Sequence, residues 1–422
     1  MITKYTIIAL GLFATTAPAQ TSGTPSPAPP EAAFESEGLV ETKVFLPENV
    51  MKGGLHIINP QAENDGLLNT YFLHSGDNVF EVTTGMALRI RISELYAIDK
   101  LHGMSKTDEF TKALKAAGKQ KVDSVVGLVK DPIGTIKRVP LGASRFFGRI
   151  GESMKGGGSE GEGKALQNIS GVQKAKVALA AKLGVSPYST NPELQEQLTN
   201  TARAMAGGGL VLSAATLPIG GAVGGTITVV NVNKDLQQAL VTSTPEDLRI
   251  TNRKKLFALG VTRENADEFL MHPWYSPWHE TIIVDALAAI GRDPSQFLER
   301  ACRALTEQDA NYFQSLAQVL ARYHKTKTPL RSIRLENDRI CAMDSNGTLV
   351  VPLSCDYAIW SEHAAGRVEN FNQLLQNRGS EIKGLALWVD GKVSERAVQE
   401  IKNRKIDLAT GVLSEPAKPN TP

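Results

Sequence analysis

The sequence predicts an α+β protein, with a small antiparallel β-sheet near the amino terminus, a largely helical middle and a small α/β unit near the carboxyl terminus. Three observations support this prediction. Short strand-like runs bounded by turn residues occupy 55–84, and apolar residues recur at helical spacing from 86 onward. After Pro329, strand and helix patterns follow in the order ββαβαβ, which is typical of a partly parallel sheet.

The first 19 residues have the form of a secretory signal peptide. Lys4 precedes an apolar run at 5–14, and Ala-Pro-Ala at 17–19 has the A-x-A form that signal peptidase cuts. The run is shorter than the roughly 20 residues that cross a bilayer. No cysteine lies near the cleavage point, so no lipoprotein is expected. We therefore expect an exported protein, periplasmic or secreted, that is cleaved after Ala19.

Composition divides the rest of the chain into segments. At roughly 100–200 residues per domain, two or three domains are expected. In chain order, the segments are a Pro/Ser-rich tether (20–37), a small sheet followed by basic amphipathic helices (38–150), a glycine-rich linker (151–165), a helical domain (166–328), a small α/β domain (329–410) and a polar tail (411–422). No internal repeat at a spacing of 20–50 residues accompanies them, so we expect neither a solenoid nor a propeller.

Local signals predict several element boundaries. Thr244, Ser276 and Thr306 each precede a first turn with proline or acidic residues, as helix N-caps do. Ser105 with Asp108 has the spacing of a capping box for a further helix. Asn346-Gly347 predicts one hairpin turn, and Ser75-Gly76-Asp77-Asn78 predicts another, between strands at 67–74 and 79–84.

The chain has three cysteines, Cys302, Cys341 and Cys355, which is too few for a disulfide framework. If Asn346-Gly347 forms a two-residue turn, Cys341 faces Pro352, and Cys355 lies three positions further along the strand. A bond between Cys341 and Cys355 is one alternative. We expect buried free thiols, because free cysteine commonly behaves as a small core residue.

The stretch KGGGSEGEGKA at 155–165 fits the GxGxxG, GxSxG and P-loop patterns at once. Each pattern needs a strand before the glycines, and no apolar strand precedes Gly156. Ala165 stands where a P-loop has Ser or Thr, and Glu160 and Glu162 would repel phosphate. We therefore predict a linker, no nucleotide partner and no cofactor.

Charge is balanced overall but not locally. With 46 basic and 44 acidic residues, net charge does not favour a nucleic-acid partner. Segment 112–155 carries ten basic and three acidic residues, a net charge of +7, beside apolar residues at helical spacing. We expect it to touch an anionic membrane surface or another envelope component, and the alternative is an ordinary amphipathic helix with a solvated face. The expected contact residues are Lys119, Lys121, Lys130, Lys137, Arg138, Arg145 and Arg149.

Residues 204–232 contain no charge and are long enough to span a bilayer. However, glycines and Pro218 interrupt the stretch, and irregular backbone cannot be satisfied by lipid. We favour a buried position in a soluble core over membrane insertion.

MHPWYSPWHE at 271–280 is the densest aromatic and histidine patch. Two or three histidines with a carboxylate can bind zinc or activate water, which would make the protein a metal-dependent hydrolase. The residues concerned are His272, His279, Glu280 and His324. No second histidine lies one turn after His279-Glu280, so a HExxH site is absent. We favour a structural role, with Ser276 as a helix cap, and expect no metal site and no enzyme.

A hydrophobic strand ends at Asp390-Gly391-Lys392, and a helix begins at Ser394. Backbone amides there, with Lys392, Ser394 and Arg396, are candidates for binding an anion. An ordinary capped βα turn is the alternative. Together with DPIGT at 131–135, this pattern resembles stretches of exported bacterial proteins of no assigned activity. The resemblance implies an exported bacterial origin and no catalytic residues.

The sequence therefore predicts an exported, envelope-associated binding or structural protein that touches an anionic surface through 112–155. The two alternatives are a metal-dependent hydrolase and a protein that inserts into the membrane through 204–232.

Overall fold

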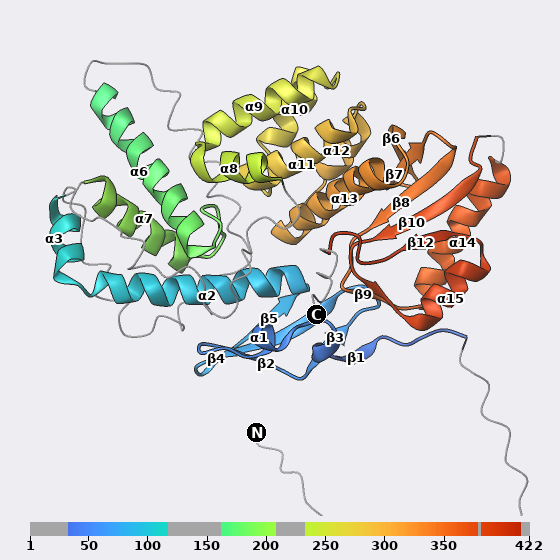
Figure 1. The fold of residues 1–422 in the computed structure, drawn as a ribbon, viewed down its shortest axis with the longest axis horizontal. Coiled ribbons are helices and arrows are strands. Elements are labelled where there is room, and N and C mark those ends of the chain that lie inside the picture. Colours follow the sequence, from blue (N-terminus) through green and yellow to red (C-terminus); the bar gives the residue numbers. More distant parts are fainter. Residues whose placement is uncertain (1–32, 117–161, 208–232, 379–380, 415–422) are drawn as a thin grey trace, which may run out of the picture. The chain divides into compact units, whose positions relative to one another are not determined.

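The computed structural model describes residues 33–116, 162–207, 233–378 and 381–414, with the backbone alone over 162–170. The described residues from Glu35 onward form one compact unit, and every element named below lies in it. An antiparallel sheet comes first, then a series of helices, then a mixed sheet with helices on both faces (Figure 1). The predicted α+β class is confirmed.

The first sheet is a set of short antiparallel strands in the order β1-β3-β4-β2, with β5 also paired to β4. The strands are β1 (Gly38–Glu41), β2 (Ile57–Ile58), β3 (Gln61–Asn64), β4 (Asn69–Ser75) and β5 (Asn78–Thr83), with the short helices η1 (Thr42–Val44) and α1 (Glu48–Met51) before β2. The predicted hairpin turn is confirmed, since Ser75 pairs with Asn78 and Gly76 has a φ of 56°. Tyr71 and Leu73 of β4 pack against Leu88 and Ile92 of the following helix.

Helices make up the middle of the chain. They are α2 (Gly85–Ser105), α3 (Asp108–Ala116), α6 (Glu162–Leu183), α7 (Pro192–Ala206), α8 (Lys234–Thr242), α9 (Pro245–Ala258), α10 (Arg263–Leu270), α11 (Pro277–Ile290), α12 (Ser295–Ala301) and α13 (Glu307–Thr326). Thr244, Ser276 and Thr306 are N-caps, as predicted. Among the described helices, none is both long and apolar enough to cross a membrane.

Two predicted boundaries in this region are wrong. Ser105 is the last residue of α2, and the hydroxyl of Thr107 instead accepts the Phe110 N–H of α3 at 3.2 Å. The Ser105 hydroxyl donates to the His102 carbonyl oxygen within α2. Helix α6 begins at Glu162, inside the predicted linker 151–165.

The second sheet has the strand order β12-β10-β8-β7-β6, and β10 runs parallel to both β8 and β12. Its elements are β6 (Leu330–Glu336), β7 (Arg339–Asp344), β8 (Thr348–Leu353), α14 (Glu362–Asn377), β10 (Gly384–Val389), α15 (Glu395–Asn403) and β12 (Asp407–Ala409), with β9 (Tyr357–Ala358) and β11 (Lys392–Val393) forming a separate parallel pair. The partly parallel sheet is confirmed. Strand β6 was not predicted; the Asn337-Asp338 turn that joins it to β7 has positive φ at both residues.

The turn after β7 differs from the expected two-residue hairpin. The Asp344 carboxylate accepts the N–H groups of Asn346 and Thr348 at 2.9 and 2.7 Å, which holds a longer loop. Met343 therefore pairs with Leu349, and the register differs by one residue from the one that would place Cys341 opposite Pro352. The thiols of Cys341 and Cys355 are buried and unbonded, as expected, and Cys302 is also free.

The two faces of the second sheet pack against different helices (Figure 1). Ala342, Val350 and Ala386 belong to a core cluster with α13, whereas their neighbours Cys341, Leu349 and Leu385 face α14 and α15. The crossovers through α14 and α15 leave the carboxyl ends of β8, β10 and β12 at one edge of the sheet.

Candidate functional site

A cavity of about 850 Å³ lies at the edge of the sheet where the parallel strands end. Cys355 and Asp356 reach it after β8, Asp390, Gly391 and Lys392 after β10, and Thr410 and Gly411 after β12. Its other walls come from α2, the starts of α11 and α13, the 45–50 segment and the loop around Tyr188. Ligands of sheets with parallel strands bind at this edge, and the volume lies within the roughly 300–1,000 Å³ of small-molecule sites.

Helix α13 lines the cavity with a stripe of polar residues. The stripe consists of Glu307, Asn311, Gln314, Ser315 and Gln318. Their spacing places them on one helical face, which would ordinarily be solvated. Instead, Gln314, Ser315 and Gln318 are only 9%, 3% and 8% exposed. The other face of α13 packs on the sheet, so both faces of this helix are covered.

Two polar groups in the wall lack partners. The side-chain amide of Gln314 makes no hydrogen bond to any described residue. The hydroxyl of Tyr188 is buried and also has no hydrogen-bond partner there. An amide and a hydroxyl can each donate and accept, so this wall can bind a ligand that carries both kinds of group. A buried polar group without a partner, as the Tyr188 hydroxyl is, is uncommon in proteins and indicates a site for a water or a ligand.

Arg89 and Glu307 are opposite charges that line the cavity and pair with nothing of opposite charge. The Arg89 guanidinium makes no hydrogen bond or ion pair within the described chain, and burial lowers its pKa. Glu307 accepts the Thr190 hydroxyl at 2.6 Å but forms no ion pair there, and burial raises its pKa. Burial shifts the pKa of each group toward its neutral form, and the nearby charge of Arg91 offsets this shift for Glu307 only in part.

The other carboxylates of the cavity are occupied by the protein itself. The Glu94 carboxylate accepts hydrogen bonds from the Arg91 guanidinium at 2.9 Å and from the Asn191 side-chain amide at 3.2 Å. Asp390 accepts the Cys355 N–H at 2.8 Å and the Ser354 hydroxyl at 2.7 Å, while burial raises its pKa to about 6. Asp390 thereby joins the loops after β8 and β10, and Glu94 holds the loop before α7, so the protein itself already occupies both carboxylates.

The four proposed hydrolase residues do not form one site. His279 completes the Ser276 capping box through Nδ1 and donates from Nε2 to Asn311 at 3.1 Å; burial lowers its pKa to about 4. Glu280 is fully buried against Arg249. His272 and His324 accept the N–H groups of Trp274 and Leu330. Within the described residues, no cluster of three His, Cys, Asp or Glu could hold a metal ion.

The predicted anion-binding residues lie at the start of α15, where a carboxylate of the chain is already bound. Ser394 caps α15 by accepting the Ala397 N–H at 3.1 Å and donates to Glu35 at 2.5 Å. Glu35 also accepts the Trp360 N–H at 2.6 Å. Lys392 donates to the Val44 carbonyl oxygen at 2.6 Å, and Arg396 lies in the first turn of α15. Of the three, Lys392 lines the large cavity.

Other predicted features lie outside the described residues. They are the seven basic residues between Lys119 and Arg149, the glycines at 155–161 and most of 204–232, in which Ala204 is a buried residue of α7.

Gly391 forms the closest backbone contact of the cavity floor. A Cβ at this position would lie 1.9 Å from the Cys355 carbonyl oxygen, which is too close for any side chain. We expect Gly391→Ala to lower the free energy of unfolding by about 1–3 kcal/mol, because the backbone must move. Urea denaturation would measure this effect. Gly54→Ala is the control, since a Cβ there meets nothing within 4 Å; equal losses in both variants would contradict the expectation.

Fold and site together define an α+β protein with a polar cavity at the carboxyl ends of the parallel strands. Comparison with protein families, characterised proteins and solved structures gives no match to this chain.

Proposed function

We propose that the chain is an exported binding protein whose large cavity holds a small zwitterionic ligand, such as an amino acid or a short peptide. The observation that supports this proposal is the presence of Arg89 and Glu307 in one cavity, each partly buried and neither in an ion pair within the described chain. A ligand that carries both a carboxylate and an ammonium group supplies one partner to each.

The energetics favour such a ligand. A buried charge without a partner is costly, so a bound counter-charge recovers part of that cost. The planar guanidinium of Arg89 can receive a carboxylate through two parallel hydrogen bonds. The free oxygen of Glu307 can accept from an ammonium, while Gln314 and Tyr188 can hydrogen-bond the amides between. Trp278 and Ile282 provide an apolar wall.

Calorimetric titration of the mature protein tests the proposal. The ligands are a panel of amino acids, dipeptides and tripeptides, with the N-acetylated and C-amidated forms of each one that binds. We expect each cap to weaken binding about tenfold or more, because it removes one charge-assisted contact. In Arg89→Met, amidation of the ligand's carboxyl end should no longer weaken binding. In Glu307→Gln, acetylation of its amino end should no longer weaken binding. Capped and free ligands of equal affinity would show that the two charges do not recognise the ligand.

The affinity for a zwitterion should also depend on pH through Glu307. Burial raises the pKa of Glu307 in the free protein, and a bound ammonium would lower it in the complex. Binding is therefore linked to loss of a proton, so affinity should rise as pH increases through the pKa of the free protein and then level off. Titrations between about pH 4 and 8 would measure this slope. Glu307→Gln should flatten it, and a slope that survives this substitution would exclude Glu307 as its origin.

We also propose that segment 112–155 touches an anionic membrane surface at the envelope. The net charge of +7 supports this proposal; Lys112 and Lys115 lie on α3, and the remaining basic residues lie outside the described part of the chain. The mature protein should bind anionic liposomes at low salt and be released by high salt, since surface charges are screened. Binding that is absent at low salt would remove the proposal.

A further inference from the structure

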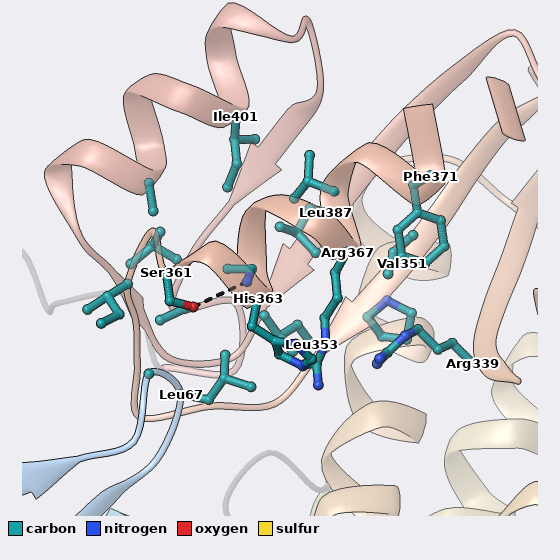
Figure 2. A pocket seen from close by; sticks show the side chains of 18 of the residues that line it. Leu67, Arg339, Val351, Leu353, Ser361, His363, Arg367, Phe371, Leu387 and Ile401 are labelled. Atoms are coloured by element: carbon teal, nitrogen blue, oxygen red, sulfur yellow. Dashed lines mark hydrogen bonds between the residues drawn. The ribbon is translucent and has the colours of Figure 1, made fainter. Parts of the chain in front are cut away.

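A second, smaller cavity of about 340 Å³ lies beneath α14, next to the second sheet (Figure 2). Apolar side chains from the sheet, from α14 and α15 and from α13 form most of its wall. These include Val351, Leu353, Phe371, Leu387, Ala397 and Ile401. The proposed zwitterion site does not involve this cavity, so the two inferences stand independently.

The packing of α14 explains why a cavity exists here. The helix has no buried residue, although Val368 and Phe371 face the sheet as apolar positions of an amphipathic helix do. Both side chains line the cavity and are therefore only partly covered. An apolar helical face that the sheet does not fully cover leaves space for an apolar ligand.

Two arginines without counter-ions lie at one end of this cavity. Figure 2 shows the guanidinium groups of Arg339 (β7) and Arg367 (α14) at the same end, with Leu387 and Ile401 toward the other. Neither arginine forms an ion pair or hydrogen bond with a described residue, and the Nε of Arg367 is buried without a partner. Burial lowers the pKa of Arg367, and the nearby charge of Arg339 lowers it further.

The acidic residues of the rim do not neutralise this pair. Asp338 is bound to Arg300 and Arg303 at 3.4 and 3.0 Å. Asp65 accepts the N–H groups of Leu67 and Leu68 at 2.9 and 2.7 Å. Glu37 lines the rim and forms no ion pair within the described chain. The polar end of the cavity therefore keeps two like charges together, an arrangement that an anion would stabilise.

We propose that this cavity binds an anionic amphiphile, namely a medium-chain hydrocarbon with a carboxylate or phosphate head. The head group lies between Arg339 and Arg367, and the chain lies along Val351, Phe371 and Leu387. Guanidinium groups bind both kinds of head through paired N–H donors. The volume is near the lower end of the roughly 300–1,000 Å³ of small-molecule sites, so a single short chain fits better than a two-chain lipid.

Calorimetric titration of the mature protein with decanoate, decyl phosphate and decanol tests the proposal. We expect decanoate, decyl phosphate or both to bind, and decanol to bind at least about tenfold more weakly, because it lacks the charge. Whichever anion binds more tightly identifies the head group. Binding of neither anion at concentrations up to about 1 mM would overturn the proposal.

Substitutions locate the binding site. Arg339→Met and Arg367→Met keep an apolar side chain of comparable length and should each weaken anion binding about tenfold. Arg331→Met, at an exposed position of β6, is the matched control and should leave binding unchanged. Anion binding that is equally strong in all three variants would overturn the assignment to this cavity.

Thermal unfolding shows whether a loss of binding in Arg367→Met comes from a destabilised fold. Without ligand, Arg367→Met should unfold at a temperature no lower than that of the parent chain, since it removes an unsatisfied Nε and a like-charge contact. Loss of binding together with an unchanged or raised midpoint supports a ligand-binding role. A markedly lowered midpoint would show that Arg367 stabilises the fold, which would contradict the proposal.

Discussion

Replacing Arg249 by methionine is expected to lower the free energy of unfolding by about 3–5 kcal/mol, the range for breaking one side of a buried ion pair. Glu280 is 0% exposed, and Arg249 reaches both of its oxygens at 3.0 to 3.3 Å. Burial raises the pKa of Glu280, and the guanidinium opposes that rise while its own pKa is raised by the carboxylate. Without Arg249, the carboxylate must be neutralised or remain uncompensated in the core.

Urea denaturation of two matched variants measures this effect. Arg253 pairs with Asp267 at 2.6 Å, but both side chains are about a third exposed, so Arg253→Met should cost no more than about 1 kcal/mol. The double variant Arg249→Met/Glu280→Met should recover much of the loss, because both charges are then removed. Equal losses for the Arg249 and Arg253 variants would contradict a buried-charge origin.

Asp356→Ala is expected to lower the free energy of unfolding by about 2–4 kcal/mol, because two partly buried N–H groups lose their charged acceptor. The Asp356 carboxylate accepts the Asn69 N–H of β4 at 3.0 Å and the Gly85 N–H of α2 at 2.9 Å. It thereby connects the loop after β8 to the amino-terminal sheet. Burial raises the pKa of Asp356, which keeps the net effect below the full value of two charged hydrogen bonds.

Hydrogen exchange of the variant locates the effect. The N–H groups of Asn69 and Gly85 should exchange faster in Asp356→Ala, since they lose their acceptor. In Asp356→Asn, the exchange rates of these two amides should lie between those of Asp356→Ala and those of the parent chain, because asparagine retains one acceptor oxygen. Asp99→Ala, on the exposed face of α2, is the control. Unchanged exchange at both amides would show that Asp356 does not hold this connection.

Sequence patterns predicted the fold best where the signals are local. The caps at Thr244, Ser276 and Thr306 follow from residues within one helical turn, and the β4–β5 hairpin follows from its glycine turn. Strand β6 was missed because Asn337-Asp338 is a weaker turn signal than the Asn346-Gly347 of the next hairpin. The register of that next hairpin was missed because the Asp344 carboxylate lengthens its turn.

The candidate site could not be predicted in the same way, because its residues meet only in the folded chain. Arg89 and Glu307 belong to helices far apart in sequence, and nothing near either one indicates a shared cavity. The polar stripe of α13 was present in the sequence, but a polar helical face ordinarily indicates solvent. The strand end at Asp390-Gly391-Lys392 was predicted, since strand-to-helix order is a local pattern, and in the structure these residues line the large cavity.

If Arg89 and Glu307 hold the two charged ends of one ligand, a crystal structure of the protein soaked with the tightest-binding peptide of the calorimetric panel should show that peptide in the large cavity. Its carboxylate should lie on the Arg89 guanidinium and its ammonium on the Glu307 carboxylate. A peptide bound elsewhere, or bound in this cavity with neither end on these two residues, would contradict this expectation.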